Sequence, residues 1–196
     1  PDTDFKRFFE WFDLMEDEER RERELRRDFE YRSPILECVR GALSEIVDSY
    51  TNPRILIRPL RFVMDRVDSD GSQYELRIEQ LSEGYKIEIA TVADLAARMA
   101  GANPQMSNPL SAKGIVLIDE VDLHLHPKWQ RTILRDLNRV FPNIQFIVST
   151  HSPIIVVGAA EIAQVVNLNA VFSEGDELLP SVYISNIGQV LLSDFF

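Results

Sequence analysis

The sequence is poor in several features that mark particular classes of protein. Its single cysteine, Cys38, cannot build a disulfide framework, which favours a reducing, cytoplasmic setting. No apolar run approaches the roughly 18 to 20 residues that cross a bilayer, so we expect no membrane span. Only four of the 21 basic residues are lysines, and 32 acidic residues give a formal net charge of -11. That charge argues against a broad surface for nucleic-acid phosphates on this chain.

The first thirty residues predict a long helix with two different halves. Phenylalanines at positions 5, 8, 9 and 12 follow helical spacing, whereas residues 16–32 are almost purely charged. We interpret the second half as an exposed, solvated arm; a partner-docking or coiled-coil arm is the alternative, but apolar heptad positions are not sustained. Acid-before-base pairs at i,i+4 support the helix: Glu16/Arg20, Asp17/Arg21, Glu19/Arg23 and Glu22/Arg26.

The remainder predicts an α/β fold in three segments: a helical arm over 1–50, a small antiparallel hairpin and a helix over 51–112, and a parallel-sheet core over 113–196. Before the core we expect a helix from Pro34 to about Ser49, strands over 54–58, 62–67 and 74–78, a helix over 84–100 and a loop over 103–112. In the core we expect buried strands over 114–118, 144–148 and 163–168, an amphipathic helix from Pro127, a turn over 173–177 and a helix over 186–196.

Two acids follow the apolar strand over 114–118. Burying a carboxylate is costly, and it is tolerated where a cation compensates. Ligands bind at the carboxyl ends of parallel strands, so Asp119 could hold a nucleotide-bound Mg²⁺ through a water and Glu120 could act as general base on the attacking water. The plainer interpretation is that these acids cap the turn before the Pro127 helix.

Two further polar groups have functional and ordinary interpretations. Residues 149–153 follow the next strand of the sheet, so His151 could donate a hydrogen bond to a phosphate oxygen or could be a satisfied polar residue. Ser82 and Gly84 begin the helix over 84–100, where free backbone N–H groups attract anions. An ordinary capped helix explains that second pattern equally well.

Together, in this order and spacing, these three groups resemble the ABC-type ATPase superfamily. The stretch from Ile118 to Pro127 is particularly similar to the stand-alone ATPases grouped with the overcoming-lysogenization-defect, RecF and SMC-like heads. The resemblance covers residues 31–196. It implies that Ser82 and Gly84 form the signature motif, Asp119 is the Walker B acid, Glu120 the catalytic glutamate and His151 the switch histidine, with Asp122 in the D-loop. Glu83 stands where the family usually has a second glycine.

The resemblance also implies a partner and a missing element. A phosphate-binding loop needs Gly-Lys-Ser/Thr, and none of the four lysines follows a glycine. We therefore expect this chain to be the C-terminal part of a head whose Walker A lobe is absent, and to be inactive alone. The complete protein would bind ATP and Mg²⁺ between two copies. Relatives of this type act in DNA repair or in Septu- and retron-type phage defence with a nuclease or toxin partner, and any DNA contact would come from segments outside this chain.

Two other functions are compatible with parts of the sequence. A metal-dependent hydrolase could use His124 and His126 with Asp119, Glu120 or Asp122 to bind zinc or manganese. Within the resemblance these two histidines are interpreted as positional, near the dimer seam. A non-catalytic interaction module, binding a partner through the charged helix, is the third candidate, and the presence of both acids after the strand argues against it.

Overall fold

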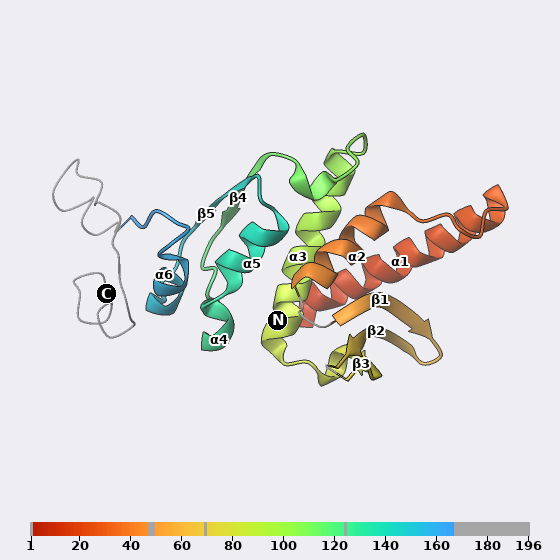
Figure 1. Ribbon diagram of the computed structural model, residues 1–196, viewed down its shortest axis with the longest axis horizontal. Coiled ribbons are helices and arrows are strands. Elements are labelled where there is room, and N and C mark those ends of the chain that lie inside the picture. Colours follow the sequence, from red (N-terminus) through yellow and green to blue (C-terminus); the bar gives the residue numbers. More distant parts are fainter. Residues whose placement is uncertain (1, 47–49, 69, 124, 167–196) are drawn as a thin grey trace. The chain divides into compact units, whose positions relative to one another are not determined.

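The computed structural model describes residues 2–46, 50–68, 70–123 and 125–166 (Figure 1). The expected turn over 173–177 and helix over 186–196 lie outside these residues. The chain divides into two compact units: residues up to Gly114 with Val140–Ile144, and Ile115–Arg139 with the chain from Gln145 onward. None of the helices in the described ranges combines the length and apolar character needed to cross a bilayer.

The first unit packs three helices with a three-stranded antiparallel sheet (Figure 1). Its helices are α1 (Asp2–Arg26), α2 (Pro34–Ile46) and α3 (Glu83–Ala102), and its strands are β1 (Tyr50–Ile57), β2 (Leu60–Val67) and β3 (Gln73–Arg77). Short 3-10 turns occur at Ile78–Gln80 and Pro109–Ser111. The expected hairpin is therefore confirmed, and β1 extends it because Ile55 pairs with Phe62 across the β1–β2 ladder.

Aromatic side chains join α1 to the sheet. Phe8 and Phe12 meet Phe62 of β2 edge to face, with ring centroids 5.3 and 5.2 Å away, and all three are buried. Such edge-to-face pairs add to the apolar area that the rings bury. Phe8 and Phe12 of the first helical half are therefore core residues, whereas Phe5 and Phe9 are half-buried.

The charged half of α1 is not uniformly solvated, and that expectation is wrong. Glu16 and Glu19 are buried, and both accept hydrogen bonds from Arg40 of α2. Glu19 also accepts the Ser33 backbone N–H at 2.7 Å, and Glu16 accepts that of Ile55 at 3.1 Å. These carboxylates are tolerated because each has several donors.

Arg40 is the common donor of this network. Its burial disfavours the charged guanidinium, but hydrogen bonds to Glu37 and Glu16 outweigh that effect and raise the pKa of Arg40. Two of the expected i,i+4 pairs form, Glu19/Arg23 and Glu22/Arg26. Glu16 pairs with the less exposed guanidinium of Arg40 on α2, whereas Arg20 pairs with Asp17.

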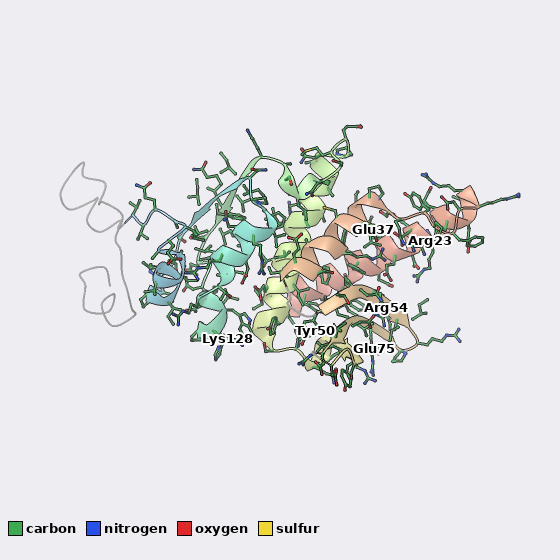
Figure 2. The ribbon with its side chains drawn as sticks, viewed as in Figure 1. Arg23, Glu37, Tyr50, Arg54, Glu75 and Lys128 are labelled. Atoms are coloured by element: carbon green, nitrogen blue, oxygen red, sulfur yellow. The ribbon has the colours of Figure 1, made fainter. Side chains whose placement is uncertain are left out.

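A second polar network lies on the antiparallel sheet. Arg54 of β1 donates to Asp65 of β2 at 2.8 Å and reaches Glu75 of β3 at 3.3 Å; Arg54 and Glu75 are both labelled in Figure 2. Asn52 adds a hydrogen bond to Asp65 at 2.8 Å. Partial burial raises the pKa of Asp65, but the Asn52 and Arg54 hydrogen bonds outweigh it, so the pKa lies below its ordinary value.

The second unit contains the expected α/β core. Strands β4 (Gly114–Ile118) and β5 (Ile144–Val148) have the predicted bounds and pair with each other. They run parallel, since Ser149 donates its N–H to Ile118 at 3.0 Å and accepts from Val121 at 3.0 Å. Leu137, Ile155 and Ala159 of this unit are buried.

Three expectations for this unit are corrected. The strands are not wholly buried, because Ile115, Leu117 and Ile147 are exposed on the two-stranded sheet of the described residues. The helix from Pro127 is divided into α4 (Pro127–Gln130) and α5 (Ile133–Val140), and the backbone between them lies against Gly158 of α6 (Pro153–Ala159). Residues 163–166 form no strand, and the rest of that expected strand is outside the described ranges.

Candidate functional site

The ends of β4 and β5 bring the predicted acids and the residues after β5 together. The two hydrogen bonds that pair Ser149 with Ile118 and Val121 continue the ladder past the last residue of each strand. The residues after β4 and those after β5 therefore face each other at one sheet edge, as the carboxyl ends of parallel strands do.

Ser149 contacts both acids of the predicted Walker B strand. Its hydroxyl donates a hydrogen bond to Asp119 Oδ1, and its Oγ accepts the backbone N–H of Glu120 at 2.8 Å. Glu120 has φ +50°, in the left-handed region that non-glycine residues adopt at a cost of about 1–2 kcal/mol. Such strained residues cluster at functional sites where the surroundings hold them in place.

The Asp122 carboxylate accepts hydrogen bonds from the two residues that follow Ser149. Thr150 donates its hydroxyl to Asp122 Oδ1, and the His151 backbone N–H donates to the same oxygen at 3.3 Å. Thr150 Oγ1 in turn accepts the N–H of Ser152 at 3.0 Å. One carboxylate thus fixes the turn that carries His151.

The side chain of His151 is exposed, and its imidazole has no hydrogen-bond partner among the described residues. That leaves the ring able to meet a ligand. His126 differs, because its Nδ1 accepts the Lys128 N–H at 3.2 Å as the N-cap of α4, and its ring meets that of Trp129 at 5.6 Å. His126 therefore has a structural role at a helix start, and His124 lies outside the described residues.

The carboxylates fit a magnesium ion that is shared with phosphates. Asp119 and Glu120 are exposed, and neither the second oxygen of Asp119 nor the Glu120 carboxylate has a partner in the described part of the chain. Mg²⁺ is commonly held by one or two carboxylates together with substrate phosphates. The described residues contain no group of three or more His, Cys, Asp or Glu side chains that could hold a metal by itself. Within the described part of the chain, Asp119 and Glu120 are therefore the carboxylates that could hold such a nucleotide-bound ion.

The predicted signature residues lie in the first unit, at the start of α3. Ser82 occupies the N-cap position with extended φ and ψ, as expected, but its side chain makes no capping hydrogen bond. It is exposed, whereas Gly84 is buried. The Ser82 hydroxyl is therefore not used to cap the helix.

The sequence patterns singled out His151 after β5 but not the hydroxyl residues around it. Ser149 and Thr150 contact the acids directly, and Ser152 bonds to Gln130, a residue with no motif of its own. The sequence does contain a pattern that could have identified these hydroxyl residues, since three of them surround His151 at the end of a strand.

Comparison with known proteins identifies the family of the chain and several relatives. A family model described as "AAA domain, putative AbiEii toxin, Type IV TA system" matches residues 3–157. The chain is similar to a retron Vc95 probable ATPase of Vibrio cholerae serotype O1 biovar El Tor, with 59% identity over 81 residues, covering 41% of this chain and 16% of that protein. It is also similar to a retron Ec83 probable ATPase of Escherichia coli, with 43% identity over 121 residues, covering 62% and 21%.

More distant similarities extend over more of the chain. A Septu protein PtuA of Bacillus thuringiensis is 31% identical over 143 residues, covering 69% of this chain and 34% of that protein. The chain therefore spans between 16% and 34% of the length of these curated relatives. Among solved structures, an SMC head bound to the C-winged helix domain of ScpA matches 80% of this chain and 48% of its own, with 20% identity and a TM-score of 0.45.

Proposed function

Because this chain belongs to the AAA domain family described as a putative AbiEii toxin of type IV toxin–antitoxin systems, we propose that it forms part of a head that binds and hydrolyses ATP. The observation that carries the proposal is the convergence of Asp119, Glu120, Asp122 and the His151 turn at one sheet edge. The probable-ATPase names of the retron relatives support it.

Each group at the edge has a proposed part in the reaction. Bound Mg²⁺ would neutralise charge on the phosphate oxygens. Asp119 would orient that ion through a water, using the carboxylate oxygen that Ser149 leaves free. Glu120 would accept the proton of the attacking water, and the His151 imidazole would donate a hydrogen bond to the γ-phosphate.

We further propose that the complete protein works as a dimer of heads with ATP between them. Ser82, whose hydroxyl does not cap α3, and the backbone at Gly84 would contact the nucleotide held by the second copy. Asp122 would lie in the loop facing that copy. The Walker A loop would come from a segment outside this chain, which contains no Gly-Lys-Ser/Thr, so the chain alone would not hydrolyse ATP.

The names of the relatives suggest the biological setting. The retron and Septu names among them fit the role in defence that we propose for the complete protein. We further propose a nuclease or toxin as its partner and a cytoplasmic location, on the resemblance of the sequence to the stand-alone ATPase group. The formal charge of -11 favours a protein partner over direct nucleic-acid binding by this part of the chain.

The test is the ATPase rate of the complete protein with Glu120→Gln, which keeps the size of the side chain but removes the base. We expect hydrolysis to fall by about 100-fold or more, within the range of a lost general base, while nucleotide binding persists and ATP-stabilised dimers accumulate on size-exclusion chromatography. Glu161→Gln is the matched control, because that side chain is 79% exposed just after α6, and its rate should be unchanged. A Glu120→Gln protein as active as the wild type would contradict the proposal.

A further inference from the structure

Ser149 has a hydroxyl whose orientation is set by its two partners. Its Oγ accepts the N–H of Glu120, so the hydroxyl proton is donated to Asp119 Oδ1. The result is one directed chain from the Glu120 backbone through Oγ to the Asp119 carboxylate. Hydrogen bonds in such a chain polarise one another.

The backbone of Ser149 adds a second attachment to the same segment. Its N–H donates to Ile118 and its carbonyl accepts from Val121, so it bonds on both sides of the two acids. The residue between these anchors, Glu120, has its backbone in the left-handed region. Ser149 therefore holds the peptide that aims the Glu120 side chain.

Ser149 is exposed, and water could satisfy its hydroxyl if it had no other role. Both of its hydrogen bonds instead go to the two acids that the proposed hydrolysis uses. Partners of this kind, which orient a metal-binding carboxylate without touching the metal, affect metal affinity and activity strongly.

We propose that Ser149 is a positioning residue that ties the metal-orienting carboxylate of Asp119 to the backbone of the base Glu120, so that one hydroxyl orients both. This inference rests on the proposed ATPase function. It adds that loss of the hydroxyl would loosen ion binding and base orientation together, although Ser149 itself touches neither nucleotide nor ion.

The test compares Ser149→Thr with Ser149→Val in the complete protein, because the two side chains have nearly the same shape and differ in the hydroxyl. We expect Ser149→Val to lower kcat by roughly 10- to 100-fold and to raise the Mg²⁺ concentration for half-maximal rate by a similar factor. The KM for ATP should stay within about twofold, because the substitution leaves the contacts to the phosphates and to the adenine base unchanged. Ser149→Thr should retain the wild-type values within about threefold, by the same reasoning.

A measurement without nucleotide or Mg²⁺ tests the attachment itself. Amide hydrogen exchange of the peptide spanning Ile118–Asp122 should be faster in Ser149→Val than in the wild type and in Ser149→Thr. Ser149→Ala serves as a second hydroxyl-free variant if Ser149→Val does not fold, and thermal melting establishes that each variant does.

The outcomes separate this inference from the proposed function. Equal kcat, Mg²⁺ dependence and amide hydrogen exchange in the Thr and Val variants would overturn the role of Ser149. If Glu120→Gln is inactive in the same experiments, the ATPase assignment still holds. A general loss of stability without a change in Mg²⁺ dependence would make the residue merely structural and would also overturn the inference. Full activity of Glu120→Gln would overturn both.

Discussion

The side chain of Gln130 joins Ser152 to the loop after β4. Ser152 donates its hydroxyl to Gln130 Oε1 at 2.7 Å, and Gln130 Nε2 donates to the carbonyls of Asp122 and Leu125 at 3.3 and 3.0 Å. The Ser152 Oγ also accepts the N–H of Ile154 at 3.2 Å as the N-cap of α6. One amide from α4 thus connects the segments that follow the two strands.

Replacing Gln130 with methionine should loosen this connection. The change keeps the length of the side chain but leaves two carbonyls and the Ser152 hydroxyl without their partner, so we expect unfolding free energy to fall by about 1–3 kcal/mol. Urea unfolding measures this change in the free energy of unfolding. Gln105→Met, in an exposed loop, is the control and should change stability by less than about 0.5 kcal/mol. Equal midpoints for the two variants would show that the Gln130 bonds add nothing.

The candidate site could be predicted from the sequence only where its residues follow a strand. Acids directly after an apolar strand are a local signal, and so is a histidine after the next strand, because parallel strands end at one edge. The sequence did not identify Gln130 as part of the site, because its amide links Ser152 to the loop after β4 only through the packing of α4 beside α6. The functional roles of Ser82, Asp119, Glu120 and His151 stay predictions.

Gly158 permits a close approach between α6 and the backbone between α4 and α5. A β-carbon at this position would lie 2.3 Å from the Arg131 carbonyl oxygen, a backbone atom that cannot move aside cheaply. We expect Gly158→Ala to destabilise the chain at the upper end of about 1–3 kcal/mol, because it overpacks a rigid contact. Thermal melting checks the size of the effect.

Gly41 provides the matched control for that substitution. It also lies in a helix, α2, but nothing stands within 4 Å of an added β-carbon. Gly41→Ala should therefore stabilise by about 0.5–1 kcal/mol through helix propensity alone. If both alanine variants shift the melting temperature in the same direction, the contact with Arg131 does not limit the packing.

The fold itself followed from periodicity, with errors where tertiary contacts intervene. Short apolar runs gave both core strands their bounds, because the length of such a run is a local property of the sequence. It could not show that Glu16 and Glu19 leave solvent, because burial of a carboxylate depends on Arg40, which lies on another helix. The break after Gln130 likewise depends on α6 and Gly158 rather than on a helix-breaking residue.

The ion-pair network of the first unit should be sensitive to loss of its common donor. Arg40→Met leaves the carboxylate of Glu16, whose side chain is 9% exposed, without a guanidinium partner, and leaves that of Glu19, 3% exposed, with Arg23 alone. Breaking a buried pair from one side costs about 3–5 kcal/mol, and we expect a loss in that range from denaturant unfolding. Arg98→Met is the control, because its pair with Asp94 is 74% and 64% exposed and its loss should change the free energy of unfolding far less. Similar losses in both variants would mean that burial does not strengthen the Arg40 network.

Asp65 should make stability depend on pH in the acid range. Its pKa is lowered in the folded chain by Asn52 and Arg54, against the opposing effect of burial, from an ordinary value of 3.8. A depressed carboxylate contributes stability that is fully present above the unfolded pKa and is lost as pH falls below 3.8 through the folded pKa. The difference in the free energy of unfolding between wild type and Asp65→Asn should therefore be constant near neutral pH. It should shrink as the pH falls below 3.8.

Carboxyl NMR titration measures the cause directly. The midpoint of Asp65 should lie below 3.8 in the wild type and should rise in Arg54→Met, which removes the donor 2.8 Å away. Arg77→Met on β3 is the control, because Arg77 forms no ion pair within the described residues and its loss should leave the midpoint in place. A midpoint of Asp65 that does not respond to Arg54→Met would show that Asn52, rather than the guanidinium, dominates the shift.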